Sequence, residues 1–100
     1  MNAPGDSLEF SEGPVFKRME RLVPGLADAI RAQYAERPHS LLAVDEFLRK
    51  GRIELDGQPY EFLLGRRGPT KVYLFTVVPV REGRGIPDED IRRYVGVLKR

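Results

Sequence analysis

Hydrophobic patterning changes midway along the chain, and this change restricts the folds that the chain can adopt. In the first third, apolar residues recur at helical spacing, which predicts helices over residues 14–22 and 25–36 with a break at Pro24-Gly25. Further along, apolar and polar residues alternate on both sides of Asp56-Gly57, a pair typical of a tight hairpin turn. Residues 70–80 are apolar on both faces, which is typical of a central strand. Helices grouped before antiparallel strands predict an α+β fold with a three-stranded antiparallel meander.

The segments around these elements complete the predicted fold. Residues 7–10 are short and alternating, which predicts a first strand. Ser40 is a helix-capping residue and Gly51 a common helix terminator, so the stretch between them is predicted as a short third helix, with a loop as the alternative. Three consecutive acids near the end of the chain and basic residues at its close suit the two ends of a helix dipole, and predict a C-terminal helix. We expect residues 1–6 to be flexible and residues 7–100 to form one domain.

The composition excludes several kinds of site. The chain has no cysteine, so disulfides, thiolate catalysis and cysteine zinc sites are excluded. It has one histidine, and the acids Asp88, Glu89 and Asp90 are better explained as the first turn of a helix than as a Mg²⁺ site. We therefore expect no metal and no cofactor. No run approaches the roughly 20 apolar residues of a membrane span, so we expect a cytoplasmic protein that does not enter the membrane.

Basic residues gather around the strands of the predicted sheet. The net charge is +2 and the pI about 9.1, a mild excess that matters less than its distribution. In a meander the start of one strand lies beside the end of its neighbour, so separate basic groups can converge on one rim of the sheet. The residues concerned are Arg49, Lys50, Arg52, Arg66, Arg67, Lys71, Arg81 and Arg84.

Two residue types in this region favour a nucleic-acid ligand. The planar fork of arginine suits phosphate, and Tyr60 and Tyr73 offer rings on which the bases of single-stranded RNA can stack. RNA is also cleaved when its own 2′-hydroxyl attacks the adjacent phosphate, a reaction that needs a base, an acid and positive charge. Lysine, arginine and tyrosine can supply all three without a metal. The alternative is that the basic residues only solubilise turns and protect sheet edges.

The layout resembles the RelE/ParE/HigB-like toxins of bacterial toxin–antitoxin pairs. LEFSEGPVFKRMERLVPGLADAIRAQYAERP, from residue 8, is similar to their opening strand and two helices. GRRGPTKVYLF, from residue 65, resembles the HigB-type pattern of Gly, two basic residues, Gly-Gly, a basic residue and a β run. FTVVPVREGRGIPDEDIRRYVGVLKR is similar to their last strand, basic residue and closing helix. Three positions depart from the pattern: Pro69 replaces a glycine, Lys71 an arginine, and Phe75 a tyrosine.

The resemblance implies a ribonuclease that cleaves mRNA, usually on the ribosome, with a cognate antitoxin covering its basic face. Carried over by position, Arg66, Arg67 and Lys71 would bind RNA phosphate or stabilise the transition state. Arg81 matches the basic residue after the last strand and is the foremost catalytic candidate. Tyr73 lies near the family's aromatic position, where it would stack a base or transfer a proton. ParE-like members inhibit gyrase instead, so the fold alone does not decide the target.

Two noncatalytic functions remain open. A nucleic-acid-binding module would use GRRGPTK as the wing of a winged helix, but the helix before it would carry Asp45 and Glu46, which repel phosphate. A small protein inhibitor or accessory subunit would instead offer an apolar sheet face to its partner, because three helices need not cover both faces of a short sheet.

Overall fold

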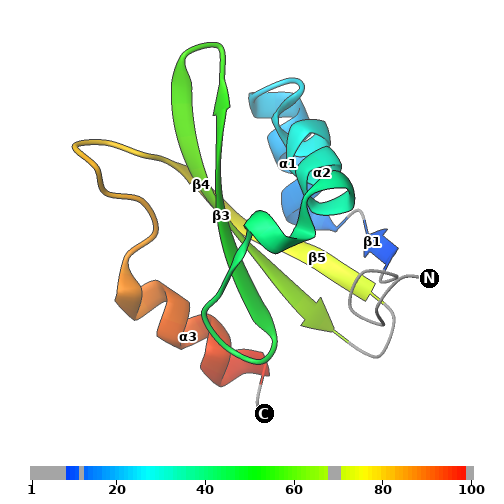
Figure 1. The fold of residues 1–100 in the computed structure, drawn as a ribbon, viewed down its shortest axis with the longest axis vertical. Helices are drawn as coiled ribbons and strands as arrows, with labels where there is room; N and C mark the ends of the chain where they lie inside the picture. Colours follow the sequence, from blue (N-terminus) through cyan, green and yellow to red (C-terminus); the bar gives the residue numbers. More distant parts are fainter. Residues whose placement is uncertain (1–8, 12, 68–70, 99–100) are drawn as a thin grey trace.

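A computed structural model describes residues 9–11, 13–67 and 71–98, which form one five-stranded sheet flanked by three α-helices (Figure 1). This arrangement confirms the predicted α+β fold. In chain order the elements are β1 (Glu9–Ser11), α1 (Pro14–Leu22), α2 (Leu26–Glu36), the 3₁₀ turn η1 (Pro38–Ser40), β2 (Leu42–Ala43), β3 (Leu48–Leu55), β4 (Gln58–Arg67), β5 (Lys71–Pro79) and α3 (Asp88–Leu98). No helix in the described part of the chain is long and apolar enough to cross a membrane.

The sheet contains the predicted meander at its centre. Its strand order is β1-β5-β4-β3-β2, with β1 parallel to β5 and every other neighbouring pair antiparallel. The Asp56-Gly57 turn joins β3 to β4, and both residues have positive φ angles, 52° and 82°. Those angles are typical of a two-residue type I′ turn, which fixes Leu55 opposite Gln58 and sets the register of the whole hairpin.

The predicted third helix is wrong. Its stretch of the chain instead forms η1, β2 and the start of β3. The N–H of Phe47 donates to the Asp45 carboxylate at 3.2 Å, a local bond that favours a turn over a helix. Leu48 is then fully buried in the sheet, and Gly51 sits where an added Cβ would lie 2.5 Å from the side chains of Leu41 and Phe62. Tertiary packing thus decides the conformation of this stretch.

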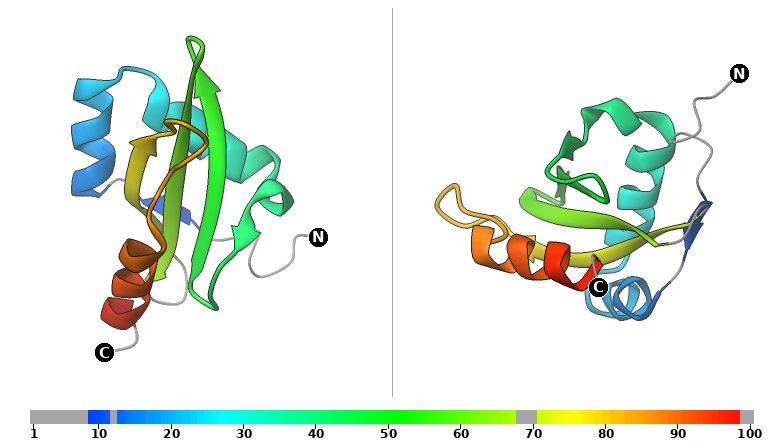
Figure 2. Two further views of the ribbon diagram at one scale, coloured as in Figure 1. Left: turned by 90° about the vertical axis from the view of Figure 1, so that its left-hand side faces the viewer. Right: turned by 90° about the horizontal axis from the view of Figure 1, so that it is seen from below.

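Each face of the sheet carries its own part of the core. On the first, here called the α2 face, Phe62, Leu64, Val72 and Leu74 pack against residues of α2 such as Ile30. On the second, the α3 face, the sheet residues Leu48, Leu63, Phe75 and Val78 meet Ile86 and Ile91 together with Tyr94 and Val95. Figure 2 shows α2 and α3 on opposite sides of the sheet. β5 is therefore apolar on both faces, as predicted for a central strand.

Candidate functional site

The basic residues form two groups, so the expectation of one common rim is wrong. The start of β3, the end of β4 and the start of β5 meet at one end of the sheet, which places Arg49, Arg66 and Lys71 there. Arg81 follows the opposite end of β5. That strand has nine residues and a strand rises about 3.3 Å per residue, so its two ends lie about 25 Å apart. Arg81 and Lys71 therefore cannot act on the same phosphate.

The first of the two groups contains Lys50, Arg52, Arg81 and Arg84, on the Arg81 side of the sheet. At its centre is a buried acid, Glu61, whose side chain is 3% exposed. The Nε–H of Arg52 donates to Glu61 Oε2 at 2.8 Å, and the backbone N–H of Ile86 donates to Oε1 at 2.8 Å. Lys50 Nζ lies 3.9 Å from the same carboxylate. Arg52 also donates through Nη2 to the carbonyl of Gly83 at 3.2 Å. These residues, here called the Glu61 cluster, tie the segment before α3 to the sheet.

Two residues that were predicted to bind RNA, Lys50 and Arg52, belong to the Glu61 cluster. Lys50 and Arg52 face a buried carboxylate, so much of their charge is balanced within the fold. Sequence reasoning missed Glu61, although the signal was present. The two-residue turn sets Leu55 opposite Gln58, and counting outward from it brings Arg52 opposite Glu61.

Arg81 and Arg84 lie in a tight turn beside this cluster. Each donates its backbone N–H to the other's carbonyl at 2.9 Å, and Glu82 and Gly83 between them have φ angles of 54° and 76°. Arg81 is exposed, and Arg84 lines an open hollow of about 410 Å³ together with residues of the Glu61 cluster and Asp88. The acids Glu61 and Asp88 make this hollow mixed in charge.

The second group lies where β4 passes to β5, and its members point to different faces. Arg49 and Arg66 lie near Tyr34 of α2, with Glu46 beside them. Lys71 is exposed and stands two residues before Tyr73, so strand alternation places both on the α3 face. The side chain of Arg67 and residues 68–70 lie outside what the structure describes.

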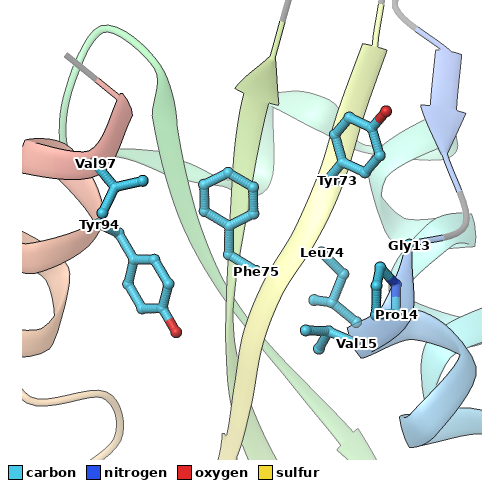
Figure 3. A pocket seen from close by; sticks show the side chains of 8 residues that line it. All are labelled: Gly13, Pro14, Val15, Tyr73, Leu74, Phe75, Tyr94 and Val97. Atoms are coloured by element: carbon cyan, nitrogen blue, oxygen red, sulfur yellow. The ribbon is translucent and has the colours of Figure 1, made fainter. Parts of the chain in front are cut away.

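An aromatic groove of about 400 Å³ lies on the α3 face, where Tyr73, two residues after Lys71 on β5, lines it. Its walls are the start of α1 and one side of α3, and β5 forms its floor (Figure 3). The rings of Phe75 and Tyr94 lie 5.7 Å apart between centroids, and the ring of Tyr73 lies against Gly13. The lining residues are Gly13, Pro14, Val15, Tyr73, Leu74, Phe75, Tyr94 and Val97.

This groove separates the two tyrosines that were expected to stack bases. Tyr73 lines it, whereas Tyr60 packs against the core on the α2 face. Tyr94 was not predicted as a site residue, because the sequence does not show against which face of the sheet the C-terminal helix packs. Three aromatic rings and an apolar floor are thus combined in the groove, and an exposed cation, Lys71, precedes Tyr73 by two residues on β5.

Comparisons with known proteins do not assign the chain. A scan against models of known protein families found no match, and a search of curated proteins found none either. The likeness to toxins of the RelE/HigB type therefore stays a prediction from the sequence. A function has to be argued from the arrangement of the residues themselves.

Proposed function

We propose that the chain is a RelE/HigB-like, metal-independent endoribonuclease that binds single-stranded mRNA at Lys71 and the aromatic groove. The order of its elements supports this proposal, since a strand, two helices, a meander and a closing helix are what the resemblance implies. The observation that carries the proposal is the succession of Lys71, Tyr73 and Phe75 on one face of β5, the last two of which line the groove.

The spacing of these residues suits one nucleotide. Lys71 and Tyr73 are two residues apart on an extended strand, which separates their Cα atoms by about 7 Å. A base stacked on Tyr73 would enter the groove beside Phe75 and Tyr94, while its phosphate reaches the ammonium group of Lys71. Stacking on aromatic rings next to a cation is the usual way in which single-stranded RNA is held.

The same residues suit the chemistry of RNA self-cleavage. The 2′-oxygen forms a bond to phosphorus as the bond from phosphorus to the 5′-oxygen breaks. Lys71 would stabilise the negative charge that develops on the phosphate oxygens, and the Tyr73 hydroxyl would protonate the leaving 5′-oxygen. The attacking 2′-hydroxyl would lose its proton to solvent water, and Tyr94 carries the second hydroxyl that lines the groove. Arg81 has no part in this site, because β5 separates it from Lys71.

The partners follow from the same proposal. The substrate is mRNA, either free or on the ribosome, and the natural inhibitor is an antitoxin protein that covers the groove. The alternative is a noncatalytic binding protein. The apolar lining of the groove is the observation that supports this alternative, because apolar side chains of a partner protein could fill the groove in place of an RNA base.

The proposal is tested by following labelled mRNA with the purified protein, alone and in a bacterial translation extract. We expect wild type to shorten the mRNA and the Lys71→Ala variant to do so roughly 100-fold more slowly. The matched control is Lys17→Ala, which removes an exposed lysine from α1 and should leave cleavage unchanged. Intact mRNA with folded wild-type protein under both conditions would contradict the ribonuclease and favour the binding protein.

A further inference from the structure

The second half of β3 has an open edge. β2 pairs with β3 only through Leu42 opposite Lys50 and Ala43 opposite Arg49. Within the described residues, no strand pairs with β3 beyond that point on the side away from β4. Leu42 of β2, opposite Lys50 and beside the start of this open stretch, is 61% exposed. Unpaired backbone of β3 thus lies next to an exposed apolar side chain.

The register shows which backbone groups the open edge offers. The N–H of Arg66 on β4 donates to Phe47, just before β3. Because backbone groups alternate in direction along a strand, the even-numbered residues of β4 bond toward β3. Their partners on β3 include Ile53 and Leu55, so the N–H and C=O groups of Arg52 and Glu54 point outward. Those four groups can bond to another strand.

When two copies of this edge run antiparallel, positive residues of one copy lie opposite negative residues of the other. The sequence from residue 50 reads Lys-Gly-Arg-Ile-Glu-Leu-Asp, with two cations before Ile53 and two acids after it. In an antiparallel pair centred on Ile53, Arg52 of one copy lies opposite Glu54 of the other, and the reverse pair forms as well. Opposite charges placed directly across a strand pair stabilise it.

We propose that a second copy of this chain pairs through the β3 edge, antiparallel and centred on Ile53, so that one sheet continues through both copies. A two-fold axis makes such an interface self-complementary. Antiparallel pairing centred on Arg52 or on Glu54 would place one like-charged pair at its centre, beside oppositely charged pairs, and parallel pairing in register would place only like charges across the strands. The register centred on Ile53 has no like-charged pair, so the charge pattern favours it.

Arg52 can serve both the Glu61 cluster and the second copy. It uses Nε and Nη2 within its own chain, and a guanidinium has five N–H donors. Its side chain is 54% exposed, so the remaining donors can reach the partner's carboxylate. Charged edges usually prevent strands from pairing, but here a reversed copy matches them.

The inference is tested by sedimentation of the full chain over a range of concentrations. We expect a dimer whose dissociation constant rises roughly tenfold or more in Glu54→Lys, which places two like-charged pairs across the strands. Glu54→Pro should also prevent dimer formation, because it removes an outward N–H and leaves the bonds to β4 intact. Glu20→Lys on α1, an exposed control with the same charge change, should stay dimeric. A monomeric wild type at all concentrations, or a dimer that both Glu54 variants leave unchanged, would overturn the proposal.

A cross-linking experiment tests the register itself. The chain has no cysteine, so Ile53→Cys introduces a single thiol. In the proposed register the two Ile53 positions form a pair without mutual hydrogen bonds, with Cα atoms about 4.5 Å apart, which a disulfide can bridge. Mild oxidation should give covalent dimers of Ile53→Cys and few of Val97→Cys, a control at an exposed position on α3. Equal cross-linking of the two variants would exclude this register. Neither experiment depends on ribonuclease activity.

Discussion

The Glu61 cluster and the aromatic groove lie on the same face of the sheet, but they treat positive charge differently. In the cluster, Lys50 and Arg52 surround a buried carboxylate that also accepts the N–H of Ile86. At the groove, Lys71 is exposed and forms no ion pair with any residue that the structure describes. Lys50 and Arg52 thus face a buried carboxylate, whereas Lys71 is a cation exposed at the surface.

The largest expected effect is on stability, in the Glu61→Ala variant. This change leaves Lys50, Arg52 and the N–H of Ile86 without their shared acceptor. We expect the free energy of unfolding to fall by about 3 kcal/mol, because a buried charge-assisted network loses its centre. Urea unfolding measures this change, and Glu20→Ala serves as the exposed control on α1. Equal stability of the two variants would mean that the cluster does not hold the segment before α3.

The next effect is on RNA binding, in the Tyr73→Ala variant. Removing the ring from the groove should weaken binding of a single-stranded RNA by about 2 kcal/mol, the usual value of one base–aromatic stack. Fluorescence anisotropy with a labelled oligonucleotide measures the affinity. Tyr73→Phe keeps the ring, so it should bind normally but cleave slowly. Normal affinity in Tyr73→Ala would remove the groove from the RNA site.

A smaller effect is the difference in unfolding free energy between variants of Arg52, which bonds Glu61, and of Lys71, which is exposed. Arg52→Ala should lower the free energy of unfolding by about 1 kcal/mol, since the half-exposed guanidinium loses its bonds to Glu61 and Gly83. Lys71→Ala should change it by less than about 0.5 kcal/mol, as expected for an exposed side chain. Thermal unfolding of both variants beside wild type gives the two values. The reverse order would contradict the division between structural and available charge.

The smallest effect concerns the salt dependence of RNA binding. If Lys71 neutralises one phosphate, its loss should reduce the slope of log K against log salt by about 0.7, the value for one contact to a single strand. Titrations at several salt concentrations measure the slope for wild type and Lys71→Ala. An unchanged slope would show that Lys71 does not contact phosphate.

The sequence predicted local features of the fold well, because they are decided by nearby residues. The break between α1 and α2 and the turn at Asp56-Gly57 occur where glycine tolerates the required backbone angles. The third helix failed because the stretch after Ser40 is shaped by distant partners, including the burial of Leu48 beneath α3. Local propensity does not contain that information.

The candidate site was predicted less completely for a related reason. Lys71 begins β5 and Arg81 follows its end. The predicted strand over residues 70–80 therefore already placed the two residues far apart, and the prediction of one common rim did not take this distance into account. The contact between Phe75 and Tyr94 joins β5 to α3, and it depends on which face that helix covers. Only the tertiary structure brings Tyr94 into the same groove as Tyr73.

The position of the active site is tested by comparing mRNA cleavage by Lys71→Ala and Arg81→Ala, each measured beside wild type in a bacterial translation extract. Both variants remove one exposed cation, and the two residues stand at opposite ends of β5. We predict that Lys71→Ala slows mRNA shortening roughly 100-fold while Arg81→Ala cleaves as wild type does. Loss of cleavage in Arg81→Ala with normal cleavage in Lys71→Ala would place the active site at the other end of the sheet and contradict a site at Lys71 and the groove.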